Sequence, residues 1–270
     1  MNFKPHLRNL IASFLALSML TACSAYPWQY HLERTHYTID LQPLSADIYL
    51  PELAEKTPPV VIVVHGGGWV RRSGDMTGIC KQLATNGIAA VNITYRSALE
   101  HPYPAAIEDV RAALAWVRNK SDELPFDSSR IALWGYSAGG HLALMAGLAP
   151  EENVSAIVSG GTPARFVSWP QSPVIQQFIG HPITTHRHLW EEASPVNHVK
   201  AGSPPVFLYH GENDDLVEPE QMTLMAAALD KKGTPVETFL VHNRGHFGTY
   251  LFGDEAEQAA IDFLKSHFLM

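Results

Sequence analysis

The segment Gly135-Tyr136-Ser137-Ala138-Gly139 has the spacing G-x-S-x-G, which can present a serine hydroxyl as a nucleophile. The apolar stretch IALW precedes it, and the stretch AGGHLALMAG, which favours a helix, follows the serine. A strand, a sharp turn and a helix in this order lift the serine side chain into the open, and the glycines leave room for the turn. The alternative is a serine that only caps the following helix.

A second glycine-rich stretch, HGGGW at residues 65–69, directly follows a predicted strand that ends at Val64. Three consecutive glycines leave their backbone N–H groups unshielded, so a ligand can approach them closely. Such N–H groups stabilise the oxyanion that forms when a nucleophile attacks a carbonyl group. The alternative is a glycine-rich turn without a ligand. A phosphate-binding loop is excluded, because no Gly-Lys-Ser or Gly-Lys-Thr follows.

Acidic and histidine side chains follow two later predicted strands. Glu212, Asp214 and Asp215 come after the stretch PPVFLYH, and His242 and His246 come after VETFLV. In a serine triad the histidine takes the hydroxyl proton, and a carboxylate orients the histidine. The order serine, acid, histidine along the chain is the order found in hydrolases with the G-x-S-x-G turn. The residue types alone leave three acids and two histidines as candidates.

Taken together, these motifs resemble the α/β-hydrolase-fold esterases and lipases of the HGGG type, which include hormone-sensitive-lipase-like enzymes and compact acetyl and feruloyl esterases. The resemblance extends over roughly residues 45–268 and includes the stretches HPYPAAIEDVRAALAWV, IALWGYSAGGHLALMAG and PPVFLYHGENDDLV. It implies that Ser137 is the nucleophile. It also implies that the amides of Gly67, Gly68 and Ala138 form the oxyanion hole.

The same resemblance selects the two remaining triad members. The family pattern H-G-x-x-D-x-x-V points to Asp214 rather than Asp215 or Glu212, and the family's Gly-His pair after the last strand points to His246. His242 is then a packing or surface residue. A triad of this kind needs neither a cofactor nor a metal ion.

Apolar runs and helical patterns alternate along the chain, which predicts an α/β fold with a mostly parallel central sheet and helices on both faces. In such sheets the reacting groups lie in loops at the carboxyl ends of the strands. Strands are expected near residues 46–50, 59–64, 88–95, 130–134, 154–159, 205–210 and 236–241. Helices are expected near residues 76–86, 104–119, 137–147, 219–232 and 255–268.

The proline-rich stretch 160–203 interrupts this alternation, and we expect it to form a short lid-like insertion of helical turns over the site. Two aromatic residues of this insertion, Trp169 and Phe178, are candidates for lining the substrate pocket. Trp69 of the glycine stretch is a third candidate. For each of these residues, packing in the core is the alternative.

The first 22 residues predict a lipoprotein signal peptide, followed by a polar connection over 23–45 and a catalytic domain over 46–270. Lys4 and Arg8 precede an apolar run over 10–20, which is too short to span a membrane. The run ends in Leu-Thr-Ala-Cys, which resembles the bacterial lipobox and implies a lipidated Cys23.

The predicted location is therefore an exported protein anchored in a bacterial membrane. Two or more acyl chains give a stable anchor. Ser24 stands where inner-membrane lipoproteins often carry Asp, so the outer membrane is favoured. The alternative is an ordinary cleaved signal in which Cys23 has no role.

Composition excludes several other classes of protein. A hydrophobic share of 46% predicts a globular chain, and a net charge of −8 without a basic block argues against nucleic acid as a partner. Cys80, the other cysteine, is expected in the core. The spacing of His181, His186 and His188 matches no strong zinc pattern, so no metal site is predicted. Structural roles are expected for Arg96, Glu108 and Asp109.

The expected substrate is a small ester with a short acyl group or an aryl group. About forty residues separate Cys23 from His65, fewer than the larger amino-terminal cap of many hormone-sensitive-lipase-like enzymes requires. Three alternatives remain. An amide or formamide hydrolase would resemble kynurenine formamidases, which tend to have tyrosine in place of Gly68. A serine peptidase of the prolyl-oligopeptidase kind would need a propeller domain. The third alternative is a non-catalytic binding protein on a hydrolase scaffold.

Overall fold

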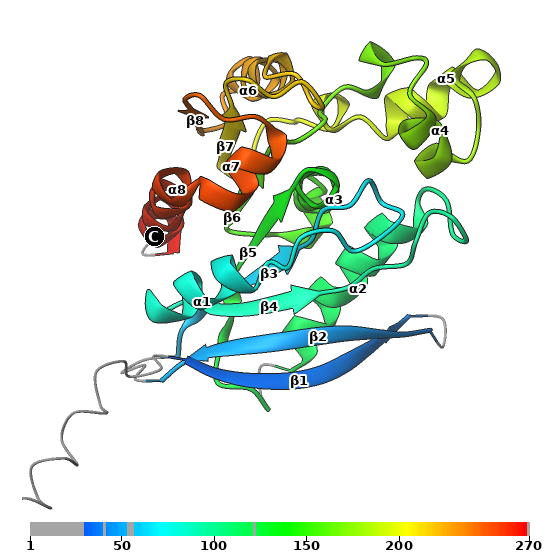
Figure 1. The fold of residues 1–270 in the computed structure, drawn as a ribbon. Helices are drawn as coiled ribbons and strands as arrows, with labels where there is room; N and C mark the ends of the chain where they lie inside the picture. Colours follow the sequence, from blue (N-terminus) through cyan, green and yellow to red (C-terminus); the bar gives the residue numbers. More distant parts are fainter. Residues whose placement is uncertain (1–29, 40–41, 53–56, 121–122, 269–270) are drawn as a thin grey trace, which may run out of the picture.

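A computed structural model describes residues 30–39, 42–52, 57–120 and 123–268. Eight strands form one sheet in the order β1-β2-β4-β3-β5-β6-β7-β8 (Figure 1). The strands are β1 (Tyr30–Ile39), β2 (Gln42–Pro51), β3 (Pro59–Val64), β4 (Ala89–Ile93), β5 (Asp127–Tyr136), β6 (Ala156–Gly160), β7 (Val206–Gly211) and β8 (Val236–Val241). The pairs β1–β2 and β2–β4 are antiparallel, and all other neighbours are parallel. The predicted mostly parallel sheet is confirmed.

Helices cover both faces of the sheet. The α-helices are α1 (Thr77–Thr85), α2 (Ala105–Asn119), α3 (Ala138–Gly147), α4 (Pro173–Ile179), α5 (Ile183–Glu192), α6 (Glu220–Asp230), α7 (His246–Phe252) and α8 (Asp254–Phe268). Figure 1 shows α1 and α8 on one side of the sheet and α2 and α3 on the other. Within the described ranges, no helix combines the length and the apolar character needed to cross a membrane.

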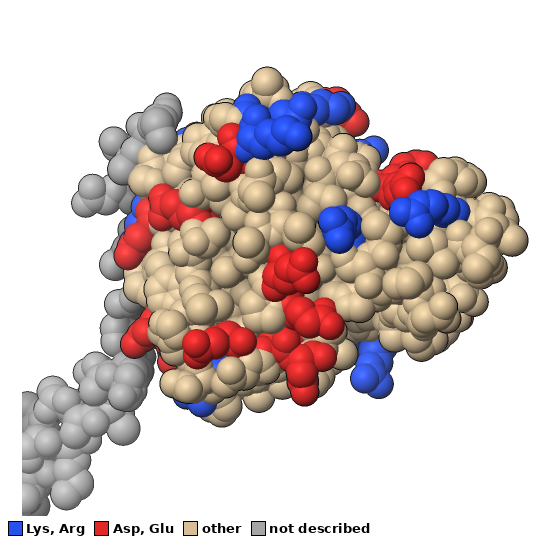
Figure 2. Space-filling model, turned by 90° about the horizontal axis from the view of Figure 1, so that it is seen from above, with Lys and Arg blue, Asp and Glu red and all other residues tan. Residues whose placement is uncertain are grey.

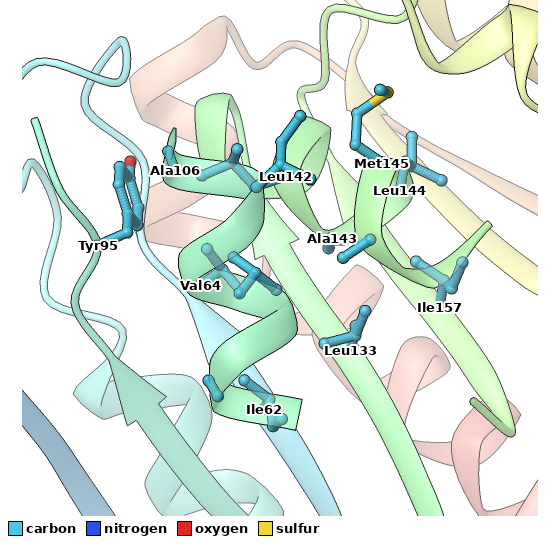
Figure 3. Packing of buried hydrophobic residues seen from close by; sticks show 14 of the residues in the cluster. Ile62, Val64, Tyr95, Ala106, Leu133, Leu142, Ala143, Leu144, Met145 and Ile157 are labelled. Atoms are coloured by element: carbon cyan, nitrogen blue, oxygen red, sulfur yellow. The ribbon is translucent and has the colours of Figure 1, made fainter. Parts of the chain in front are cut away.

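Strand β3 explains why the apolar run after Pro59 is uninterrupted. Val60, Ile62 and Val64 belong to the hydrophobic cluster beneath α2 and α3, whereas Val61 and Val63 belong to the cluster beneath α1 and α8. Alternate side chains of a strand point to opposite faces, and both faces of this sheet are covered. Figure 3 shows the first cluster, in which Leu133 of β5 lies between Ile62 of β3 on one side and Ile157 of β6 on the other. In the view of Figure 2, most acidic side chains gather across the lower middle and left of the face, and the largest group of basic side chains lies at its upper edge.

The insertion over residues 160–203 forms helical turns, as expected, at the carboxyl ends of the parallel strands. It contains α4, α5 and two short 3-10 helices, η2 (Phe166–Ser168) and η3 (Pro195–Asn197). A third 3-10 helix, η1 (Pro150–Glu152), precedes β6. Helix α4 begins at Pro173 after Ser172, whose side chain accepts a hydrogen bond from the Ile175 amide, and it ends at Gly180 with φ 80°. Local capping therefore defines this helix.

The prediction that residues 23–45 form only a connection is wrong where the structure describes them. Strand β1 occupies Tyr30–Ile39, and it pairs with β2 over its whole length, from Tyr30 opposite Pro51 to Ile39 opposite Gln42. The sequence YHLERTHYTI has no apolar run that would predict a buried strand. An edge strand bonds to one neighbour only, so its formation depends on the partner β2 more than on its own apolar content. Cys23 and the predicted signal peptide lie outside the described residues.

Candidate active site

Ser137 lies in the sharp turn between β5 and α3. Its backbone has φ 55° and ψ −121°, a left-handed conformation that is rare for a residue with a side chain. The Ser137 amide donates to the carbonyl oxygen of Gly160 at the end of the neighbouring strand β6, at 2.8 Å. A Cβ on Gly135 would overlap the carbonyl group of Gly139, and a Cβ on Gly139 would overlap that of Val64. The turn therefore holds the serine in a strained conformation that only these glycines permit.

The hydroxyl of Ser137 meets an imidazole and a carboxylate from two other strand ends. The Oγ of Ser137 lies 3.0 Å from Nε2 of His246, the first residue of α7. The Nδ1 of His246 lies 2.7 Å from Oδ2 of Asp214, which follows β7. Their exposed fractions are 6% for His246 and 4% for Asp214. The structure thus brings together the three residues that the sequence selected, in hydrogen-bond range of one another.

Asp214 is ringed by hydrogen-bond donors. Its Oδ1 accepts from the amides of Leu216 at 3.1 Å and Val217 at 2.9 Å, and its Oδ2 faces His246. The buried His210 places its Nε2 3.3 Å from the same Oδ2. Burial by itself would raise the pKa of the Asp214 carboxyl, but the bonds from His210, His246 and the Val217 amide outweigh it and hold that pKa well below its usual value. Asp214 is therefore an anion at neutral pH.

The competing acids and the second histidine lie outside this arrangement. Asp215 is exposed, and the exposed Glu212 accepts a hydrogen bond from the Asn243 amide at 3.0 Å. His242 is exposed, and its Nδ1 lies 3.4 Å from Oε2 of Glu212. The family pattern therefore chose the acid and the histidine that the fold buries beside the serine.

The glycine stretch runs directly beside the nucleophile. A Cβ placed on Gly66 would lie 3.5 Å from the Cβ of Ser137. Gly67 and Gly68 have φ angles of 121° and 59°, and no backbone carbonyl of the described ranges accepts a hydrogen bond from their amides. The amide of Ala138 is in the first turn of α3 and has no acceptor within that helix. These three amides therefore remain the candidates for holding an oxyanion at Ser137.

His65 holds the start of the glycine stretch in position. Its ring stacks on Tyr95 with a centroid distance of 4.2 Å, and its Nδ1 lies 2.7 Å from the carbonyl oxygen of Gly66. Burial lowers the pKa of His65 to about 4, so the ring is neutral at neutral pH and its Nδ1 donates to the Gly66 carbonyl.

Two of the three candidate pocket residues are packed in the core. Trp69 and Phe178 are 3% and 0% exposed, and their rings stack with centroids 4.6 Å apart. They offer almost no surface to a substrate, so the packing alternative describes them. Trp169 is half-buried, and its indole N–H donates to Oε2 of Glu218 at 2.8 Å. It alone keeps open surface.

The structural roles expected for other polar residues are found. The backbone N–H of Arg96 donates to Oδ2 of the buried Asp109 at 2.6 Å, and its Nε donates to Oδ1 at 2.8 Å. This pair ties the loop after β4 to α2.

Cys80 is buried in α1. His181 and His186 stack at 4.1 Å, and no group of side chains suited to a metal ion occurs in the part of the chain that the structure describes.

Two buried histidines near the site, His210 and His141, were not predicted from the sequence. His210 lies beside Asp214, and its Nε2 is also 2.7 Å from the carbonyl oxygen of Val217. His141 lies on α3, whose residues are otherwise apolar or glycine and are all buried. A single histidine in such a helix was the available signal, because a buried imidazole needs hydrogen-bond partners.

A nucleophile turn between a strand and a helix, a serine, an aspartate and a histidine that follow one another in this order along the chain and meet at one site, and a mostly parallel sheet define an α/β-hydrolase. Within this class the chain belongs to the BD-FAE family, whose sequence model matches residues 46–229. Esterase LipC of Mycobacterium tuberculosis is 33% identical over 196 residues, which cover 63% of this chain and 48% of LipC. The chain spans about half the length of the first curated relatives it matches.

Solved structures agree on the fold. A truncated carbohydrate esterase from gut microbiota is 22% identical with a TM-score of 0.77, covering 91% of this chain and 99% of that one. An acetyl ester-xyloside bifunctional hydrolase from Caldicellulosiruptor lactoaceticus is 27% identical with a TM-score of 0.72, covering 83% of this chain and 88% of that one. The predicted α/β-hydrolase fold is confirmed.

Proposed function

We propose that this chain is a serine carboxylesterase that works through an acyl-enzyme intermediate. The observation that carries the proposal is the chain of contacts Ser137–His246–Asp214, at 3.0 Å and 2.7 Å. It lies beside the amides of the glycine stretch, for which the described part of the chain offers no backbone acceptor. Esterases among the relatives support the same reaction class.

The first half of the reaction acylates the enzyme. The Oγ of Ser137 attacks the ester carbonyl carbon while Nε2 of His246 takes its proton, and the carbonyl oxygen becomes an oxyanion held by the amides of Gly67, Gly68 and Ala138. The oxyanion then reforms the C=O bond. The bond to the alkoxy oxygen breaks, and His246 delivers its proton to the leaving alcohol.

The second half releases the acid. Water loses a proton to His246 and attacks the acyl carbon, and the second tetrahedral intermediate collapses with Ser137 as the leaving group, which regains its proton. Throughout, the anionic Asp214 holds the Nδ1–H tautomer of His246 and stabilises its cation. No step needs a cofactor or a metal ion.

The test is covalent labelling together with turnover. A fluorophosphonate probe should label the wild type, and the wild type should hydrolyse p-nitrophenyl acetate. Ser137→Ala should abolish both. Labelling that persists in Ser137→Ala, or a wild type without esterase activity, would contradict the proposal.

We propose short-chain acyl or aryl esters as the substrates. Three exposed apolar side chains belong to residues that contact the site: Val174, Leu216 and Phe247. The ring of Phe247 lies 5.6 Å from that of His246, and a Cβ on Gly68 would lie 3.1 Å from Cγ1 of Val174. Apolar side chains beside the proposed catalytic groups favour an alkyl or aryl ester. The packed rings of Trp69 and Phe178 fill the space next to the glycine stretch, which favours a short acyl group.

A series of p-nitrophenyl esters tests the acyl length. The kcat/KM should be highest for C2–C4 chains and should decline toward C12. A higher kcat/KM for C12 would overturn the proposed preference while leaving the reaction class intact.

We also propose that lipidated Cys23 anchors the protein in a bacterial membrane, more specifically the outer membrane. The apolar run over 10–20 followed by Leu-Thr-Ala-Cys supports this. In fractionated cells, Cys23→Ser should move the protein from the membrane to the soluble fraction. An unchanged membrane fraction would contradict the anchor.

A further inference from the structure

His141, four residues after the nucleophile on α3, uses both ring nitrogens in hydrogen bonds. The indole N–H of Trp69 donates to Nδ1 of His141 at 3.2 Å, and Nε2 of His141 donates to the carbonyl oxygen of Ala193 at 2.8 Å. The ring is fully buried and stacks on Phe166 at 4.7 Å. Burial lowers the pKa of His141 to about 3, so the ring stays neutral at neutral pH.

Trp69 is the first residue after the three glycines with a side chain that can hold them. Gly66, Gly67 and Gly68 have no side chain, so neighbouring groups must fix the positions of their amides. Trp69 itself has φ 63°, a strained backbone conformation for a residue with a side chain. Its ring stacks on Phe178 of α4, and its carbonyl oxygen accepts from the Ala98 amide at 2.9 Å. The strained backbone therefore persists because the indole is held in place.

The Trp69–His141–Ala193 chain joins three parts of the site. Trp69 belongs to the glycine stretch, His141 to the helix that begins beside Ser137, and Ala193 to the end of α5 in the insertion. We propose that His141 is a positioning residue for the oxyanion hole, which fixes the Gly67 and Gly68 amides through the indole of Trp69 and ties the insertion to them. This inference rests on the proposed function.

Two substitutions at position 141 separate hydrogen bonding from packing. His141→Phe keeps a ring against Phe166 and removes both hydrogen bonds. His141→Gln can accept from Trp69 and donate to Ala193 through its amide. We expect kcat to fall about 10- to 100-fold in His141→Phe with KM changed less than about threefold, because misplacement of a catalytic group by about 1 Å costs up to 10²-fold. In His141→Gln we expect kcat within about threefold of the wild type.

The inhibition constant of a transition-state analogue distinguishes a displaced oxyanion hole from a general destabilisation of the fold. The Oγ of Ser137 adds to the carbonyl carbon of an aryl trifluoromethyl ketone. The former carbonyl oxygen of the ketone then occupies the oxyanion hole. The inhibition constant of the ketone should rise in His141→Phe by the factor by which kcat/KM falls. The shape of the kcat pH profile should stay that of the wild type, since the triad is unchanged.

A matched pair of tryptophan substitutions controls for packing. Trp69→Phe removes the indole N–H that bonds to His141. Trp190→Phe removes an equally buried indole N–H, which donates to the carbonyl oxygen of His181 at 3.0 Å inside the insertion. We expect Trp69→Phe to lower kcat as His141→Phe does, and Trp190→Phe to keep the wild-type kcat. This pair also tests the proposal if His141→Phe does not fold.

The outcomes are distinguishable. Wild-type kcat in both His141→Phe and Trp69→Phe would overturn the inference and leave the proposed esterase function standing. An equal loss of kcat in Trp69→Phe and Trp190→Phe would also overturn it, since packing would then be the cause. A wild type that neither hydrolyses esters nor binds the ketone would overturn the proposed function, and this inference with it.

Discussion

We call the carboxyl ends of the parallel strands, with the loops that carry Ser137, Asp214 and His246, the catalytic edge. Asp214 on this edge and Glu257 on α8 are almost equally buried, with 4% and 7% of their surface exposed, yet their surroundings are opposite. Asp214 has two histidines and two amides around it, and its pKa is held below the usual value. Burial raises the pKa of Glu257 to about 7, and one hydrogen bond from Gln82 of α1, at 2.7 Å, only partly offsets this. Burial alone therefore does not decide the charge of a carboxyl group. The number of donors around it does.

Glycines differ between the same two regions. On the catalytic edge, a Cβ on Gly135 or Gly139 would overlap neighbouring backbone, and Ser137 and Trp69 have positive φ angles. On α1, a Cβ on Gly78 would meet nothing within 4 Å. The catalytic edge depends on close backbone approach, whereas the α1 and α8 layer depends on ordinary apolar packing.

The largest difference should follow from adding one methyl group. Gly139→Ala should abolish activity, or prevent folding, because the methyl group would overlap the carbonyl of Val64 in the core of the sheet. Gly78→Ala is the matched control, and it should raise the free energy of unfolding by up to about 1 kcal/mol because alanine favours an exposed helix position. Activity assays and thermal unfolding measure both. A fully active Gly139→Ala would break the comparison.

The next largest effect concerns the two adjacent aspartates. Asp214→Asn should lower kcat by about 10⁴-fold, since an amide favours the wrong tautomer of His246 and cannot stabilise its cation. Asp215→Asn should stay within about threefold of the wild type, because Asp215 is exposed. Steady-state kinetics of both variants on one p-nitrophenyl ester measure the difference. A large loss in Asp215→Asn with an active Asp214→Asn would reverse the assignment.

A smaller effect is expected at Glu257, in stability and not in activity. The folded-state pKa of about 7 lies above the ordinary value of 4.5, so the folded protein binds this proton more tightly than the unfolded chain does. The associated stability is fully present below pH 4.5 and is lost as the pH rises through about 7. Glu257→Gln, neutral at every pH, should therefore stabilise the protein at pH 8.5 by on the order of 2 kcal/mol and have little effect at pH 4.5.

Thermal unfolding at the two pH values checks this, and kcat should not change in Glu257→Gln. The opposite sign is expected for Asp214, whose stabilising contribution is present at neutral pH and is lost only in strong acid. At each pH, the quantity compared is the Tm of Glu257→Gln minus the Tm of the wild type. A smaller difference at pH 8.5 than at pH 4.5 would contradict the electrostatic contrast.

The smallest expected effect is at Cys80 in the α1 layer. Burial raises the pKa of its thiol well above the usual value, so the reactive thiolate form is suppressed. In a Cys23→Ser background, a thiol reagent should label the folded protein hardly at all and leave kcat unchanged. Denatured protein should expose one thiol. Rapid labelling of the folded protein with loss of activity would mean that this layer is not a closed core.

The sequence predicted the central strands, most helices and the three residues Ser137, Asp214 and His246 that the structure brings into hydrogen-bond range, because each depends on local patterns. An uninterrupted apolar run specifies β3, and a strand, G-x-S-x-G turn and helix specify the position of Ser137. Helix α7 was not predicted, because it begins at His246, directly after the turn that follows β8. Strand β1 was not predicted, because it is held by pairing with β2 and its own sequence has no apolar signal. The pocket role expected for Trp69 and Phe178 could not be judged, since an aromatic residue reads the same whether it lines a cavity or fills it.

The sequence by itself therefore determined which residue types are available for acyl transfer and in what order they follow the strands. The tertiary structure decided which of the two neighbouring aspartates is enclosed by hydrogen-bond donors. It also placed the buried His210 beside Asp214 and the buried His141 beside Trp69. The physical reason is that spacing along the chain encodes local geometry, whereas burial and hydrogen-bond partners come from segments that are far apart in sequence and meet only after folding.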